Sequence, residues 1–155
     1  MSTPYDYVAL SRRWFEEVWN EGKLETVHQL AAPNLTAYGQ GTQPIHGPDA
    51  FLEFVHMIRG AFPDVKLNVE EAFGSGDRVV VRWSATMTHK GNHLGIAATN
   101  KPVHLTGITV IHWQDGKVVE GWDSWDQLGM WQSIDAVPRD IAGSFHARRA
   151  VTRAS

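Results

Sequence analysis

Cysteine is absent from the 155-residue sequence. Its absence excludes disulfide bonds, thiol nucleophiles and thiolate metal sites, and it is compatible with a reducing cytoplasm. The sequence also lacks an apolar run long enough to span a bilayer, and a formal net charge of −3 gives no electrostatic footprint for nucleic acid or an anionic membrane. Dinucleotide loops, phosphate loops and nucleophile elbows are missing as well. We therefore expect a cytoplasmic protein that binds neither nucleic acid nor membrane.

Tryptophan, by contrast, is abundant, with seven residues in a chain that is 43% hydrophobic. A chain of this length and composition can bury one sizeable core, which predicts a single domain. Seven indoles exceed what such a core needs, so several are expected to line a cavity or an oligomer interface. This composition favours a hydrophobic small-molecule ligand.

Helix signals dominate the first part of the chain. Thr3-Pro4-Tyr5-Asp6 and Gly47-Pro48-Asp49 each place proline at the start of an apolar pattern with helical spacing, and Thr3 is the expected N-cap of the first helix. The first helix is expected to end at Asn20-Glu21-Gly22, a second at Pro33, and the third near Gly60.

Strand signals follow Pro63, where the apolar period changes to two. One row of alternating residues in the next strand contains Val81, Trp83, Ala85, Met87 and His89. Helices followed by a long antiparallel meander predict an α+β fold, with the helices on one face of a curved sheet and a pocket between them.

The Asp115-Gly116 turn fixes the expected register of the last hairpin by counting. If these two residues form the loop, Asp126 lies opposite Leu105 and shares its face with Glu120 and Trp122. The opposite face then receives His104, Asp123 and Trp125. A bulge anywhere in the strand would exchange the faces beyond it.

Five segments occur in a recognisable order: Trp14-Phe15-Glu16-Glu17-Val18-Trp19-Asn20-Glu21-Gly22, Ile45-His46-Gly47-Pro48-Asp49-Ala50, Arg82-Trp83 with His89-x-Gly91, Asp115-Gly116-Lys117-Val118-Val119-Glu120-x-Trp122, and Asp126-Gln127-Leu128-Gly129-Met130-Trp131-Gln132. Together they resemble the SnoaL-like polyketide cyclases of the nuclear transport factor two-like superfamily, over roughly residues 5–134. The resemblance implies a cone-shaped fold of curved, mostly antiparallel sheet wrapped on helices. We expect one domain at residues 1–134 and a tail at 135–155 that is disordered or packs on a partner subunit.

The resemblance implies a role for Asp126, the position that matches the acid/base aspartate of the cyclases. Those enzymes close a ring by an intramolecular aldol reaction on a hydrophobic carbonyl compound. Such chemistry needs no metal and no other cofactor, because two carbonyls already acidify the reacting carbon. The alternative for Asp126 is an N-cap of the helix that follows it.

Other candidate site residues come from the helices and from the neighbouring strands. His89 is a second catalytic candidate, since imidazole titrates near neutrality, and its alternative is a hydrogen-bonded structural residue. Trp122 is expected to stack on a substrate ring, with a core or dimer-interface position as the alternative. The expected substrate-binding residues are Trp14, Phe54, Trp83, Met87, His104, Glu120 and Trp122.

Two alternative functions remain open from the sequence. Arg82 with Asp123 or Asp126 resembles the arginine and carboxylates that activate water in epoxide hydrolases of the same superfamily. A non-catalytic ligand-binding or dimerisation module is the other alternative. A homodimer is expected in each case, because Arg82, Ser84 and their neighbours would otherwise leave one sheet face open.

The loop Ala98-Thr99-Asn100-Lys101 departs from the family's Pro-Thr-Gly-Lys.

Overall fold

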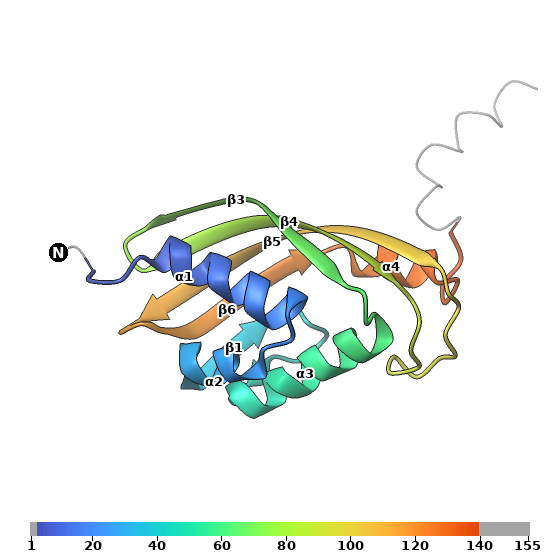
Figure 1. Cartoon of the computed structure of the whole chain (residues 1–155), viewed down its shortest axis with the longest axis horizontal. Coiled ribbons are helices and arrows are strands. Elements are labelled where there is room, and N and C mark those ends of the chain that lie inside the picture. Colours follow the sequence, from blue (N-terminus) through green and yellow to red (C-terminus); the bar gives the residue numbers. More distant parts are fainter. Residues whose placement is uncertain (1–2, 140–155) are drawn as a thin grey trace, which may run out of the picture.

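The computed structural model describes residues 3–139, and within this range helices lie against one face of a curved, unclosed, six-stranded sheet (Figure 1). The helices are α1 (Tyr7–Trp14), the π-helix η1 (Phe15–Asn20), α2 (Leu24–Leu30), α3 (Gly47–Ala61) and α4 (Gln127–Ser133). The strands are β1 (Ala31–Tyr38), β2 (Ile45–His46), β3 (Lys66–Ser75), β4 (Arg78–Thr88), β5 (Pro102–Gln114) and β6 (Lys117–Trp125). The α+β fold predicted from the sequence is confirmed.

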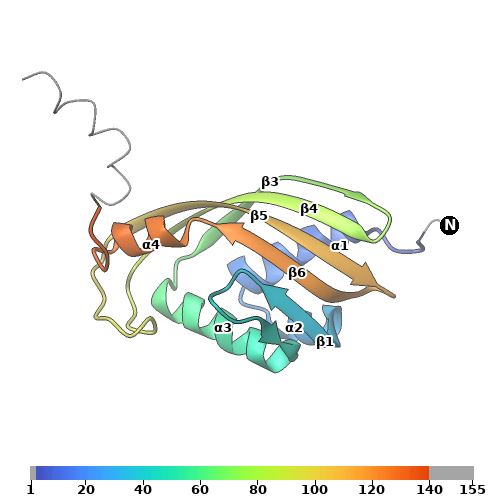
Figure 2. The ribbon, with the colours of Figure 1, turned by 180° about the vertical axis from the view of Figure 1, so that it is seen from behind.

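The sheet has the strand order β2-β1-β6-β5-β4-β3. Its neighbours are antiparallel except for β1 and β6, which run parallel. Figure 2 shows β1 beside β6, with α2 and α3 on the same side of the sheet. The parallel pairing brings the chain that follows β1 next to the end of β6, and this contact builds the site described below.

Two helix boundaries differ from the sequence prediction. The first helix begins after Asp6, whose side chain accepts a hydrogen bond from the Ala9 amide at 2.9 Å, so Asp6 and not Thr3 is the N-cap. The second helix ends at Leu30, and Pro33 lies within β1 instead of stopping the helix. Proline is accommodated there because the pairing of β1 with β6 is irregular between Ala31 and Thr36. The third helix was predicted correctly.

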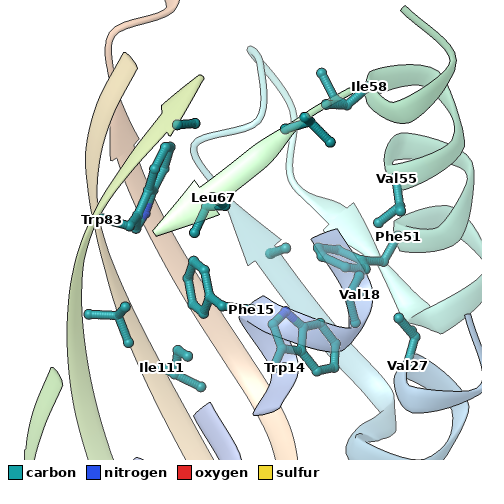
Figure 3. Close-up of a cluster of buried hydrophobic side chains, with 14 of the residues drawn as sticks. Trp14, Phe15, Val18, Val27, Phe51, Val55, Ile58, Leu67, Trp83 and Ile111 are labelled. Atoms are coloured by element: carbon teal, nitrogen blue, oxygen red, sulfur yellow. The ribbon is translucent and has the colours of Figure 1, made fainter. Parts of the chain in front are cut away.

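The core lies between the sheet and the helices. On β4 the alternating row Val81, Trp83, Ala85 and Met87 is buried, as predicted, and β5 alternates in the same way. Figure 3 shows side chains from both layers projecting into this space, including Trp83 from the sheet and Phe15 from the helical layer. Burial of these apolar side chains is the main favourable term in folding such a domain.

One end of the core contains a buried series of hydrogen bonds. Trp113, which is fully buried, stacks on Tyr7 with ring centroids 5.4 Å apart. Its indole Nε1 donates a hydrogen bond to Ser11 Oγ at 3.0 Å, and the Ser11 hydroxyl donates to the Tyr7 carbonyl oxygen at 2.7 Å. Each polar group in this series therefore has a protein partner, as buried groups require.

The described residues do not extend to either end of the sequence. Residues 1–2 and 140–155 lie outside the described residues, and with them most of the predicted tail at 135–155. In the part of the chain that the structure describes, no helix combines the length and the apolar character needed to cross a bilayer.

Candidate active site

A cavity of about 100 Å³ lies between the concave face of the sheet and the helices. Its wall is mostly apolar and aromatic, and its polar side chains gather in one place. The apolar lining includes Trp14, Phe15, Trp19, Phe51, Phe54, Trp83, Met87 and Met130. The polar lining consists of Gln40, Thr109 and Asp123. A mostly apolar cavity with a few convergent polar groups is the usual form of a small-molecule site.

A β-bulge decides which acidic residue enters this cavity. The two-residue turn and the pairing of Trp113 with Val118 agree with the prediction, but the next pair is His112 with Glu120. One extra residue on β6 reverses every face assignment beyond it. The predicted register is therefore wrong from Glu120 onward. Asp123 pairs with Thr109 and faces the cavity, whereas Glu120 and Trp122 face outward.

A glycine on the neighbouring strand makes room for the first partner of Asp123. Gly107 pairs with Trp83 across the sheet, and a Cβ at Gly107 would overlap the Trp83 ring. The indole therefore lies over Gly107 and reaches Thr109, two residues further along the same face. Trp83 Nε1 donates a hydrogen bond to Thr109 Oγ1 at 3.0 Å, and the Thr109 hydroxyl donates to Asp123 Oδ1.

The second partner comes from the loop after β1. Gly39 has a φ of +90°, and a Cβ there would overlap the Asp123 backbone, so this close approach requires glycine. Gln40 follows directly, and its side-chain amide donates a hydrogen bond to Asp123 Oδ2. Trp125 Nε1 donates to Gln40 Oε1 and to the Gly39 carbonyl oxygen, each at 3.2 Å.

The Asp123 carboxyl has an altered acidity. Its removal from water raises its pKa to about 6 from the ordinary 3.8, and the hydrogen bonds from Thr109 and Gln40 act in the opposite direction. Burial wins because the cavity wall is apolar, and two donors replace only part of the lost hydration. The whole residue is half-buried, so the carboxyl remains within reach of a molecule in the cavity. A carboxyl with this pKa can exchange a proton near neutral pH.

Asp126, the predicted acid/base residue, lies outside the cavity. It is exposed, and its Oδ1 accepts a hydrogen bond from the Gly129 amide at 2.8 Å as the N-cap of α4. The same bulge is the reason, because it turns Asp126 to the outer face together with Ser124 and Trp122. The alternative drawn from the sequence, a helix cap, describes its position.

His89, the second predicted catalytic residue, is buried, and its side chain contacts the loop that contains Thr99. Its Nδ1 accepts a hydrogen bond from the Thr99 amide at 3.2 Å and lies 3.0 Å from Thr99 Oγ1. A backbone amide only donates, so the neutral ring carries its proton on Nε2. His89 is not part of the cavity lining, and the structure does not bring it to Asp123.

The seven predicted substrate-binding residues divide into two groups. Trp14, Phe54, Trp83 and Met87 line the cavity. Trp122 stacks on Tyr38 with ring centroids 5.7 Å apart and is 37% exposed. His104 is exposed, and Glu120 lies 3.7 Å from His112 on the outer face. None of these last three lines the cavity, Glu120 and Trp122 because of the bulge.

The hydrogen-bonded group in the cavity was not predicted: Gln40, Thr109 and Trp125 were not candidate site residues, and Asp123 was a candidate only in the epoxide-hydrolase alternative. One signal in the sequence indicates which row of side chains on β6 faces the cavity. The row of Glu120, Trp122, Ser124 and Asp126 is the more polar of the two rows on β6, which favours the solvent side for it. Nothing comparable marks Gln40, whose place depends on the parallel pairing of β1 with β6.

Metal ligation is not a feature of this arrangement. Among residues 3–139, no three histidine, aspartate or glutamate side chains gather in the geometry of a metal site. The cavity lining itself offers one carboxyl group, two hydrogen-bond donors to it and an apolar wall.

Comparison with known proteins identifies the family. A family model described as SnoaL-like polyketide cyclase matches residues 9–134. The chain belongs to the SnoaL-like polyketide cyclase family. The resemblance seen in the sequence is therefore confirmed, and its boundaries agree closely with the model. A search of curated proteins gives no match.

Several solved structures have the same fold. A protein proposed to be a SnoaL-like polyketide cyclase from Jannaschia sp. CCS1 is 25% identical, with 89% of this chain and 99% of that chain covered and a TM-score of 0.79. IdmH from Streptomyces antibioticus, proposed to be a polyketide cyclase, is 25% identical over 84% and 99%, with a TM-score of 0.73. AclR from Streptomyces galilaeus, proposed to be a hydroxylase, is 25% identical over 84% and 96%, with a TM-score of 0.74.

The departure of this SnoaL-like chain in the loop before β5 has a local explanation. Asn100 stands where the family pattern has glycine, and its φ of +57° lies in the left-handed region. Asparagine tolerates this conformation better than most residues with a side chain. The loop is also held to His89, whose carbonyl oxygen accepts a hydrogen bond from the Asn100 amide at 2.8 Å. Asn100 therefore adopts a backbone conformation of the kind that glycine favours.

Proposed function

We propose that this protein is an enzyme that performs cofactor-independent acid/base chemistry on a hydrophobic carbonyl compound, an aldol-type cyclisation or a related isomerisation. Asp123 is the group that takes and returns the proton. The observation that carries the proposal is a carboxyl with a raised pKa, held by two donors, in a cavity whose wall is otherwise largely apolar. Membership of the SnoaL-like family supports the same class of reaction.

The reaction balances with Asp123 alone. The carboxylate removes a proton from a carbon next to a carbonyl, and the electron pair of the broken C–H bond stays on the substrate as an enolate. The enolate carbon then attacks a second carbonyl of the same molecule, and a C–C bond forms. The resulting alkoxide takes the proton back from Asp123, which regenerates the carboxylate. Isomerisation uses the same two proton transfers at different atoms.

The cavity wall supports this chemistry in two ways. A pKa of about 6 keeps Asp123 mostly ionised at neutral pH, while a proton bound during the reaction is held tightly enough to be carried. Aromatic side chains such as Trp14, Trp19 and Phe54 offer flat apolar contacts to a ring-bearing substrate. A dry cavity also strengthens each electrostatic interaction within it.

The epoxide-hydrolase alternative has less support. It needs Arg82 near a carboxylate that activates water, but Arg82 pairs with Glu71 at 3.1 Å on the outer face of the sheet. Asp123 faces the cavity on the opposite side. Arg82 and Asp126 both border a shallow hollow on the outer face, where no comparable apolar wall surrounds them.

A proton-exchange assay tests the proposed function without knowledge of the natural substrate. The protein is incubated in heavy water with an aryl β-ketoester, and deuterium at the acidic carbon is followed by mass spectrometry. We expect exchange above the buffer rate, and a loss of about 100-fold or more in Asp123→Asn. Asp126→Asn is the matched control and should keep the exchange rate, because Asp126 lies outside the cavity.

Two outcomes would overturn the proposed function. If ligand binding quenches tryptophan fluorescence but exchange never exceeds the buffer rate across a panel of aryl carbonyl compounds, the protein is a binding module. If Asp123→Asn exchanges as fast as the unaltered protein, the acid/base role does not belong to Asp123.

We also propose a homodimer in the cytoplasm. The outer sheet face presents Ile108 at 46% and Trp122 at 37% exposure beside the hollow bordered by Arg82 and Asp126. Such apolar exposure favours a partner, and a chain without cysteine fits a reducing compartment. Sedimentation should give twice the chain mass, and cell fractionation should recover the protein in the cytosol. A monomer, or a secreted protein, would contradict these two expectations.

A further inference from the structure

Two tryptophans lie one hydrogen bond behind Asp123. Trp83 reaches the carboxyl through Thr109, and Trp125 reaches it through Gln40. An indole N–H can donate a hydrogen bond but cannot accept one, whereas a hydroxyl and an amide can each do both. Each tryptophan therefore acts on the group in front of it in one direction only.

On the Thr109 side, the direction of the hydrogen bonds follows from the single hydroxyl proton. Thr109 Oγ1 accepts from Trp83 Nε1 at 3.0 Å, so its own proton is free to point at Asp123 Oδ1. If the hydroxyl turned to accept from a protonated Asp123, its proton would need another acceptor in a buried site. A buried polar hydrogen without an acceptor is costly.

On the Gln40 side, the direction follows from the two ends of the amide. Trp125 Nε1 donates to Gln40 Oε1, and this leaves the Gln40 NH₂ group facing Asp123 Oδ2. A flipped amide would place its NH₂ against the indole N–H, which is also a donor, and would lose both hydrogen bonds. The Gly39 carbonyl oxygen, which also accepts from Trp125, fixes the indole in place.

We infer that Trp83 and Trp125 are positioning residues that keep Thr109 and Gln40 as permanent donors to Asp123, so that the carboxyl can pass its proton only to a molecule in the cavity. Neither Thr109 nor Gln40 offers an acceptor to protonated Asp123. The proton taken from a substrate carbon is therefore returned to the substrate, and the ionised carboxyl is restored with its hydrogen bonds unchanged. This inference rests on the proposed function, since it describes how the same carboxyl is controlled.

An NMR titration of isotope-labelled aspartate carboxyl groups tests the inference directly. Thr109→Val should raise the Asp123 pKa by about one unit, because a donor to the ionised form is lost. Trp83→Phe should raise it by roughly half a unit, because Thr109 loses the indole donor that holds its hydroxyl proton toward Asp123 Oδ1. Thr109→Ser keeps a hydroxyl and should restore a titration close to that of the unaltered protein.

A double variant separates this role from simple packing. If Trp83 acts through the Thr109 hydroxyl, Trp83→Phe should have no further effect on the Asp123 titration in a Thr109→Val background. Trp113→Phe is the matched control, because Trp113 is a buried indole bonded to a different hydroxyl, Ser11. It should leave the Asp123 titration unchanged.

The outcomes distinguish this inference from the proposed function. An unchanged Asp123 titration in Trp83→Phe, or a full shift that persists in the Thr109→Val background, would overturn the role of Trp83 even in an active enzyme. A shifted titration with no proton exchange would overturn the proposed function alone. If Trp83→Phe does not fold, Trp125→Phe provides the same measurement through Gln40, with a rise in the Asp123 pKa as the expected result.

Discussion

Two buried tryptophans each donate a hydrogen bond to a hydroxyl group, and the two pairs end differently. Trp113 donates to Ser11, and the Ser11 hydroxyl donates a hydrogen bond to the backbone carbonyl oxygen of Tyr7. Trp83 donates to Thr109, and the Thr109 hydroxyl donates a hydrogen bond to the Asp123 carboxyl in the cavity. The indole-to-hydroxyl distance is 3.0 Å in both pairs, so the geometry of the first bond does not distinguish them.

The difference lies in the final acceptor. A backbone carbonyl does not titrate. The hydrogen bonds through Ser11 therefore give buried polar groups a partner and contribute only to stability. A carboxyl can gain a proton, so the hydrogen bonds through Thr109 also influence the protonation equilibrium of Asp123. The same local arrangement is therefore structural at one end of the core and part of the candidate site at the other.

The largest expected effect is on stability at the Trp113 end. Trp113→Ala removes a fully buried indole and should lower the free energy of unfolding by about 3–5 kcal/mol, because a large cavity is left behind. Denaturant unfolding measures this change, and the Asp123 titration in the surviving folded protein should stay in place. A displaced titration would show that the two ends of the core are coupled.

The pH dependence of stability sharpens the comparison at the Asp123 end. The folded pKa of about 6 exceeds the ordinary 3.8, so the folded state binds the proton more tightly than the unfolded state. This contribution is fully present below about pH 4 and is lost as the pH rises through about 6. It amounts to about 3 kcal/mol at 1.36 kcal/mol per pKa unit, as an order of magnitude.

Unfolding midpoints measured between pH 4 and pH 7 check this expectation. The fall in stability should flatten in Asp123→Asn and persist in Ser11→Ala, because only the hydrogen bonds through Thr109 end at a titrating group. The same slope in the unaltered protein and in Asp123→Asn would mean that another group is responsible.

The smallest expected effect concerns the carboxyl on the outer face. Asp126→Ala should lower the free energy of unfolding by about 1 kcal/mol, because the Gly129 amide loses its cap. Asp126→Asn should cost less, since asparagine also caps well. Thermal unfolding of both variants checks the order, and an equal loss in the two would argue that the charge matters more than the cap.

Much of the fold follows from local sequence. The Asp115-Gly116 turn has positive φ at both residues and forms the predicted two-residue loop. The alternating row on β4 and the start of α3 at Gly47 also agree with the pattern. These features depend on residues close in sequence, where turn chemistry and periodicity act directly.

The candidate site was predictable only in part. Trp14, Phe54, Trp83 and Met87 do line the cavity, and they lie on elements with clear periodicity. Gln40 was missed because its position depends on the parallel pairing of β1 with β6, which joins distant parts of the chain. Local patterns do not encode such a contact.

The sequence by itself determined an α+β domain with an apolar, tryptophan-rich interior and an acidic strand at its end. Only the tertiary structure decided which acid enters the cavity. Asp123 and Asp126 each directly follow a tryptophan, and the greater polarity of the row that contains Asp126 favours the solvent side for it without locating the bulge. A single extra residue between Val118 and Glu120 sets which row faces inward, because side chains alternate with a period of two.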